Sequence, residues 1–320
     1  MNAPTLARRY PLRALAAGAR WLINPVSENG AKQVPRMILY ATGTEILASV
    51  ERMRAHPTGK RVLADRPDLA AALSNHTALA AMPAGSFGRA FHDAMRRGGG
   101  VPGYLLAGLI YRDGFFDGYD MPDDARYAIE RSRWLHDMLH VLTGYETDLA
   151  GEGLLIFFDL GYRQSMPYSL AAVTPMGLGP LVFLRPHVGQ RRWRELLRDA
   201  HARGVAAQQR QTPMYVYWEE LLPRPLDEVR AELGIVPFAE NTADWLSKSW
   251  LGRRAATGFG GYARDVERSK LVRRLVDAGV DFRDLMRAPA GEAAYLRQLA
   301  ADGSDDATLR AAAAKLLRRA

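Results

Sequence analysis

Apolar residues recur at intervals of three and four positions along most of the chain, and this spacing predicts amphipathic α-helices. Three such stretches cover Met37 to Val50, Leu69 to Ala81 and Phe87 to Arg96, and Pro57-Thr58-Gly59 predicts a break after the first. The glycine run from Arg97 to Gly103 predicts a loop, and it lacks the Gly-Lys-Ser/Thr ending of a phosphate-binding loop. No convincing run alternates between apolar and polar residues. We therefore expect an all-α fold, a multi-helix bundle-like domain with a C-terminal helical extension.

Longer helices are predicted in the middle of the chain. Pro122-Asp123-Asp124 indicates a helix start, because acidic residues favour the positive end of the helix dipole, and this helix is expected to reach Thr143. Gly144 fits the glycine that commonly follows a helix, and Asp148 fits the N-cap of a next helix reaching Gln164. The two helices would then be antiparallel neighbours joined by a short turn. A long charged helix is predicted over Gln190–Gln209, and the following segment, Met214–Leu233, carries a Trp-Glu-Glu motif.

The pattern divides the chain into three parts: an N-terminal arm (1–35), a helical core (36–238) and a C-terminal extension (239–320). The arm is basic and amphipathic. It lacks the apolar centre of a secretory signal, although its arginine-rich, acid-poor composition also fits a mitochondrial transit peptide, and we interpret it as an interfacial or docking helix. The extension has a glycine hinge at 258–261 and is expected to form a helical cap or oligomer contact, with a mobile basic tail as the alternative.

The segment from Gln164 to Leu184 contains no charged residue, and its length alone would suit a membrane span. Pro167, Pro175 and Pro180 argue against a span, because such breaks leave backbone groups unsatisfied in lipid. We interpret the segment as an apolar lining of a cleft or of a mouth that faces a membrane.

Composition narrows the chemistry and the partners. The 320 residues include no cysteine, which excludes disulfides, thiolate ligands and cysteine nucleophiles, so a metal site would need nitrogen and oxygen donors. The net charge of +8 indicates an acidic partner surface, although arginine and alanine richness can also reflect a GC-rich genome. Because no zinc finger or RNA-binding aromatic strand accompanies the charge, a membrane surface is favoured over nucleic acid.

A group of metal-capable side chains lies in the predicted central helices. His136 and His140 are four residues apart, so a helix presents both imidazoles on one face, and Asp137 lies about 100° away around the axis. Glu152 follows after eleven intervening residues and would return on the antiparallel helix. Burying these ionisable groups among apolar neighbours is costly without an ion, so the set predicts a divalent-metal site. Asp137 is one methylene shorter than the glutamate of the H-E-x-x-H proteases, so peptide hydrolysis is not favoured.

These four residues also fit the pattern H-D-x-x-H, eleven residues, then E, which is the hallmark of the ubiquinone (coenzyme Q) biosynthesis protein Coq-four family. Other segments of the chain resemble this family as well: Gly59–Leu63 with Pro67, Leu79–Gly88, Tyr217–Leu222, Pro225–Arg230 and Leu233–Pro237. The resemblance covers roughly residues 35–238. The N-terminal arm and the residues after Pro237 depart from a typical member.

The resemblance implies a helical fold and assigns metal-binding and catalytic roles to His136, Asp137, His140 and Glu152. Zinc is the first expectation, with iron or manganese as alternatives that the sequence leaves open. The implied partners are a polyprenyl-quinone precursor lipid, a membrane surface, other ubiquinone biosynthesis proteins and further copies of this chain, without nucleic acid. The implied location is peripheral, on the cytoplasmic face of a bacterial inner membrane or the matrix side of a mitochondrial one.

The function that the resemblance implies is removal of the ring carboxylate of a polyprenyl-hydroxybenzoate and its replacement by hydroxyl. An ion next to an apolar cleft can hold the carboxylate and phenolate oxygens as a Lewis acid. Two alternatives remain open. One is a non-catalytic lipid-binding scaffold that organises the biosynthetic enzymes at the membrane, and the other is a metal-dependent hydrolase.

Overall fold

The computed structural model describes residues 6, 8–23, 28–97, 116, 119–146, 149–163, 188–240, 271, 274, 275, 278, 280 and 290–317. Within these residues the chain forms 14 α-helices, one short 3-10 helix and no strand, which confirms the expected all-α fold. None of the described helices is both long and apolar enough to cross a bilayer.

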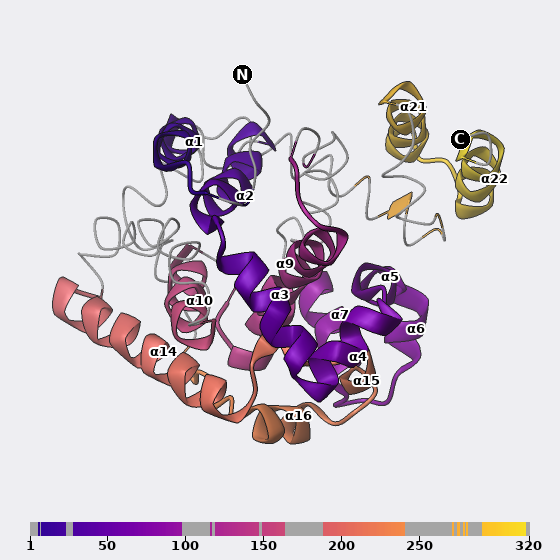
Figure 1. Ribbon diagram of the computed structural model, residues 1–320. Helices are drawn as coiled ribbons and strands as arrows, with labels where there is room; N and C mark the ends of the chain where they lie inside the picture. Colours follow the sequence, from indigo (N-terminus) through magenta and orange to yellow (C-terminus); the bar gives the residue numbers. More distant parts are fainter. Residues whose placement is uncertain are drawn as a thin grey trace.

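Figure 1 shows the arrangement of the helices. The helices of the first part are α1 (Pro11–Ile23), α2 (Glu28–Thr42), α3 (Glu45–Ala55), α4 (Pro57–Asp65), α5 (Leu69–Ser74), α6 (His76–Ala81) and α7 (Phe87–Arg97). Those that follow are α9 (Asp123–Thr143), α10 (Leu149–Tyr162), α14 (Gln190–Arg210), η1 (Pro213–Tyr215), α15 (Trp218–Leu221), α16 (Leu226–Leu233), α21 (Ala290–Ala301) and α22 (Asp306–Leu317).

Several predicted helices are interrupted by single residues. Gly43 adopts a φ of +52°, so the apolar stretch predicted as one helix is divided between α2 and α3. Asn75 ends α5, and its side-chain oxygen accepts a hydrogen bond from the Ala78 amide at the start of α6. The break predicted at Pro57-Thr58-Gly59 is wrong in position, because Pro57 is the first residue of α4 and only His56 separates it from α3.

The segment with the Trp-Glu-Glu motif forms three short elements, η1, α15 and α16. Pro225 separates the last two helices, as a residue without an amide hydrogen often does. Trp218 belongs to the core with 1% exposure, and its indole nitrogen donates to the Pro213 carbonyl.

The largest hydrophobic cluster lies where α7, α9, α10, α14 and α15 meet. Its bulkiest members are all at most 1% exposed: Trp193, Trp218, Tyr162, Phe87, Phe91 and Phe158. Burying side chains of this size contributes about 1.5–3 kcal/mol each, so this cluster sets how α9 and α10 lie.

Two glycines bring α10 and α14 into direct backbone contact. A Cβ added at Gly204 would lie 2.0 Å from the Phe158 carbonyl oxygen, and one added at Gly161 would lie 2.3 Å from the His201 carbonyl oxygen. No larger side chain fits between these helices, so the placement of α10 depends on α14.

The terminal parts bury apolar faces of their own. Ala17 of α1 packs against Met37 of α2, and Ile156 of α10 contacts this pair. α2 continues across residue 35, the boundary predicted between arm and core. At the other end, Leu296 of α21 and Leu309 of α22 are fully buried. The three-part division itself stays a prediction.

Four predictions fall outside the described residues. They are the N-cap role of Asp148, the loop over 98–103, the charge-free segment of 164–184 and the glycine hinge at 258–261.

Candidate metal centre

The helix α9 carries the predicted histidine pair near its C-terminal end. Asp123 and Asp124 occupy its first turn, as expected from the helix dipole, and the predicted end at Thr143 is confirmed. Gly144 follows with a φ of +74°, and its amide donates to the His140 carbonyl. This left-handed residue turns the chain back toward α10.

Three side chains from α9 and α10 converge at this turn. The Nε2 atom of His136 lies 3.0 Å from one carboxylate oxygen of Glu152, and the Nε2 atom of His140 lies 3.3 Å from the other. The two Nε2 atoms are 3.3 Å apart, and the rings meet edge to face at 88°. All three donor atoms lie within 4.8 Å of one another, a group that could hold a metal ion.

A hydrogen bond to the backbone orients His140. Its Nδ1 atom lies 2.9 Å from the Tyr145 carbonyl oxygen, an acceptor only, so we assign the proton to Nδ1. The Nε2 atom then presents a lone pair toward the Glu152 carboxylate and the His136 ring. Lone pairs and negatively charged oxygens that face one another in this way repel unless a proton or a cation lies between them. The residues present therefore fit a divalent ion.

Neighbouring charges shift the pKa values of His136 and Glu152. Burial alone lowers the pKa of His136, but the charge and hydrogen bond of Glu152 outweigh burial and raise that pKa to about 9. Asp137 and Asp159 act in the same direction. Burial alone raises the pKa of Glu152, whereas the two histidines hold it well below the usual range. An incoming ion must therefore displace a proton shared between His136 and Glu152.

Asp137 lies beside the centre and not within the converging group. It is 6% exposed, and its carboxylate is not among the donor atoms that meet within 4.8 Å. Its negative charge still favours the protonated form of His136. Asp137 therefore acts on the centre through its charge, while its direct ligation of a metal ion stays a prediction.

A buried ion pair that the sequence reading missed supports the centre. The Arg163 Nε atom donates to the Asp159 carboxylate at 2.7 Å, and both side chains are close to 10% exposed. Arg163 also donates to the Ser132 carbonyl on α9 at 3.3 Å. The spacing of four residues between Asp159 and Arg163 was the available signal.

The centre is open on one side. The side chain of His140 is 4% exposed, while those of His136 and Glu152 are 40% and 37% exposed. Three protein ligands with an accessible side suit an ion that keeps a coordination position for a substrate or water. The fold and this site together define an all-helical protein with a candidate divalent-metal centre.

The sequence profile described as "Coenzyme Q (ubiquinone) biosynthesis protein Coq4" matches residues 37–239 of this chain. The chain belongs to the Coq4 family, which confirms the resemblance found in its motifs. The matched region includes the whole candidate metal centre and leaves out α1, α21 and α22.

Curated relatives carry the same family name. The chain is 31% identical over 185 residues to "Ubiquinone biosynthesis protein coq4, mitochondrial" of Talaromyces stipitatus, a match that covers 58% of each chain. It is 30% identical over 185 residues to the protein of that name from Arthroderma otae, covering 58% of this chain and 62% of the relative. The matches thus span less than two thirds of these relatives' lengths.

A solved structure shares the fold. The crystal structure of a candidate ubiquinone biosynthesis protein from Nostoc punctiforme PCC 73102 aligns with a TM-score of 0.50 and 18% identity. The alignment covers 71% of this chain and 99% of that chain. At this identity the likeness concerns the fold alone.

Proposed function

We propose that the protein is a metal-dependent enzyme of ubiquinone biosynthesis that replaces the ring carboxylate of a polyprenyl-hydroxybenzoate with hydroxyl. The observation that carries the proposal is the convergence of His136, His140 and Glu152 on one point of an open face. Membership of the Coq4 family supports the pathway. The exact reaction and its substrate are what the resemblance to this family implies, and they are part of the proposal.

The bound ion would supply Lewis acidity toward the carboxylate and phenolate oxygens of the ring. The protein's own part is positioning. The Tyr145 carbonyl fixes the ring of His140, and the charge of Asp137 acts on His136 from the buried side. Glu152 is held in its charged form by both histidines, so it binds as a carboxylate.

The three ligand side chains, two imidazoles and one carboxylate, restrict which metal ions can bind. Two imidazoles and one carboxylate suit zinc, and the same set with open positions is also typical of non-haem iron. Replacing a carboxylate by hydroxyl releases carbon dioxide and needs an oxidant, for which molecular oxygen is the candidate. Zinc cannot exchange electrons, so an oxidative reaction favours iron or manganese at this centre.

The α1 helix supports a peripheral location on a membrane. Leu12 and Leu15 are 80% and 69% exposed, three residues apart on one face, and Arg8 and Arg20 are also exposed. An amphipathic helix of this kind can lie in the interface of an anionic bilayer. Such a location would bring the centre to a long-tailed substrate and to other enzymes of the pathway.

The test is turnover by the isolated protein. We expect protein loaded separately with zinc, iron or manganese to convert a prenylated hydroxybenzoate in the presence of oxygen, with product hydroxylated where the carboxylate was lost. A folded Glu152→Ala variant is expected to lose this turnover. Lipid binding without turnover under every metal and oxygen condition would overturn the enzymatic proposal and favour the scaffold. Turnover of an ester or amide instead would favour the hydrolase.

A further inference from the structure

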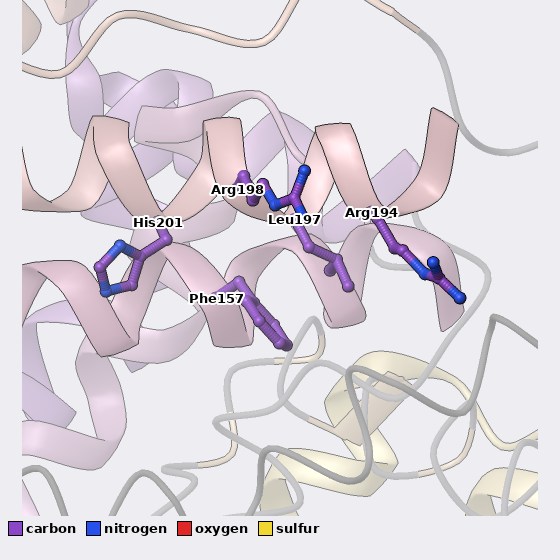
Figure 2. Close-up of a pocket in the computed structure, with 5 residues that line it drawn as sticks. All are labelled: Phe157, Arg194, Leu197, Arg198 and His201. Atoms are coloured by element: carbon purple, nitrogen blue, oxygen red, sulfur yellow. The ribbon is translucent and has the colours of Figure 1, made fainter. Parts of the chain in front are cut away.

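A hollow lies between α10 and α14, and none of the described residues that line it belongs to the candidate metal centre. It measures about 340 Å³, and the described residues that line it are Phe157, Arg194, Leu197, Arg198 and His201. We call it the α10/α14 pocket. Figure 2 shows the apolar side chains of Phe157 and Leu197 side by side, with Arg194 and His201 at opposite ends. The pocket thus has an apolar floor, formed by Phe157 and Leu197, and a nitrogen-rich rim, formed by Arg194, Arg198 and His201.

The helical repeat places the rim on one face of α14. Arg194, Leu197, Arg198 and His201 occupy positions i, i+3, i+4 and i+7, which lie above one another on an α-helix. Arg194 and Arg198 are therefore like charges one turn apart, about 6 Å along the axis. Such a pair destabilises an isolated helix, so helix stability does not explain it.

Neighbouring acidic residues do not neutralise this pair. Glu195 and Asp199 are the acidic residues of α14. Glu195 pairs with Arg191 at 3.1 Å, and Asp199 pairs with Arg203 at 2.7 Å. Among the described residues, the two arginines of the pocket form no ion pair, and both are exposed. Their charge is available to a ligand.

The first turns of α14 also leave the charge of Arg194 without an acidic partner. No acidic residue lies in its first turn, but Glu195 and Glu240 pair with Arg191 and Arg192, so Arg194 is the arginine near this end that has no ion pair among the described residues. A negative group above the α10/α14 pocket would meet the guanidinium groups of Arg194 and Arg198.

We propose that the α10/α14 pocket binds one molecule of a phosphate-bearing lipid. Its head group lies between Arg194 and Arg198, His201 donates a hydrogen bond, and the chain follows Phe157 and Leu197. The charge of the rim suits an anion, and the apolar floor distinguishes an amphiphile from free phosphate. The proposal goes beyond the reaction at the metal centre and does not depend on which reaction that is.

The test titrates the full chain with dodecyl phosphate below its micelle concentration, followed by calorimetry. We expect Arg194→Gln/Arg198→Gln to weaken binding by about tenfold or more, since hydrogen bonds to charged groups have about that effect. The matched control is Arg191→Gln/Arg210→Gln, which removes the same charge from exposed sites on α14 outside the pocket and is expected to stay within about twofold.

Two further probes test the nature of the ligand. Phe157→Ser is expected to weaken dodecyl phosphate binding and to leave inorganic phosphate unaffected. If inorganic phosphate displaced the probe at equal concentration, the lipid claim would be overturned. If dodecyl maltoside, which carries no charge, bound equally well, the role of the arginines would be overturned.

A metal measurement separates this proposal from the one above. The Arg194→Gln/Arg198→Gln variant is expected to keep the metal content of the wild type. If instead dodecyl phosphate binding disappeared with the metal in His136→Ala/His140→Ala, and persisted in the pocket variant, the probe would bind at the metal centre and the proposal would be wrong.

Discussion

His140 is fixed at one ring nitrogen by a backbone carbonyl and presents the other nitrogen toward His136 and Glu152. Such an outer hydrogen bond orients an imidazole before any ion arrives, and losing one commonly costs about 10–100-fold in metal affinity. The ring therefore needs little reorganisation to bind.

We expect protein purified without added metal to contain near-stoichiometric zinc, iron or manganese by elemental analysis. His140→Ala should lose it, because the variant removes a ligand and not merely its support. His201→Ala is the matched control, since this exposed histidine lies on α14 outside the converging group. Affinity should fall on acidification as protons compete for the imidazoles. Full occupancy in His136→Ala/His140→Ala would contradict the site.

A second prediction concerns Asp124 in the first turn of α9. It lies 2.6 Å from both Arg54 and Arg66, and the hydrogen bond from Arg54 lowers its pKa. A depressed pKa stabilises the fold above the unfolded-state pKa, and this stability is lost as pH falls through the folded-state value. We expect Asp124→Asn to lower the free energy of unfolding by about 0.5–1 kcal/mol at pH 7.

Urea unfolding at a series of pH values measures this effect. The difference between wild type and Asp124→Asn should shrink below pH about 4 and vanish once the carboxylate is protonated in both states. Asp123→Asn is the control, because Asp123 is exposed in the same turn of α9. A difference that did not depend on pH would show that the ion pairs are not its cause.

At the residue scale, the sequence predicted the side chains that converge in the candidate metal centre better than the groups that orient them. The spacing of His136, His140 and Glu152 follows from helical geometry and a short turn, so it could be inferred without coordinates. The Tyr145 carbonyl could not, since every residue has one and only the turn after Gly144 directs this one at a histidine. Whether Asp137 would lie in or beside the group depended on side-chain direction.

At the scale of elements, α1 has two apolar sides. One packs on α2, and the other exposes Leu12 and Leu15. We expect Leu12→Asp/Leu15→Asp to reduce sedimentation with anionic liposomes strongly, because it removes the apolar face and adds repulsive charge. High salt should weaken the binding of the wild type.

The matched control for this experiment is Val236→Asp/Tyr295→Asp. These side chains are 64% and 53% exposed, and the variant adds the same charge away from α1. It should bind liposomes about as well as the wild type. Equal partitioning of the wild type to neutral and anionic vesicles would remove the electrostatic part of the prediction.

Element boundaries show where apolar spacing stops being informative. The predicted limits of α9 and α14 agree with the structure within one residue, because their apolar stripes are long and α9 has acidic residues in its first turn and a left-handed glycine at its end. The division at Gly43 depends on one backbone angle, and the division at Asn75 depends on one side-chain hydrogen bond. Neither changes the hydrophobic period, so both were missed.

At the scale of the molecule, a buried ion pair connects α9 to α15. Arg131 is 4% exposed and binds both carboxylate oxygens of Glu219, at 2.6 and 2.7 Å. It also donates to the Val216 and Pro67 carbonyls. The guanidinium group of Arg131 thus connects α9 with Pro67 and with the segment that contains Val216 and Glu219.

We expect Glu219→Gln to lower the free energy of unfolding by about 3 kcal/mol, because it leaves the Arg131 charge buried without a counter-ion. Glu220→Gln is the neighbouring control. Glu220 also pairs with an arginine, Arg61, but it is 52% exposed, so its loss should cost less than about 1 kcal/mol. Chemical denaturation of both variants decides the matter, and equal losses would refute the role given to Arg131.

The glycine contact between α10 and α14 has a mechanical consequence. Carbonyl oxygens and not flexible side chains fill the space at Gly161 and Gly204, so neither helix can slide or roll against the other without a backbone clash. α10 and α14 therefore move together as one rigid unit. Any movement that widens the candidate metal centre therefore shifts α9 relative to this rigid unit, and Glu152 moves with α10.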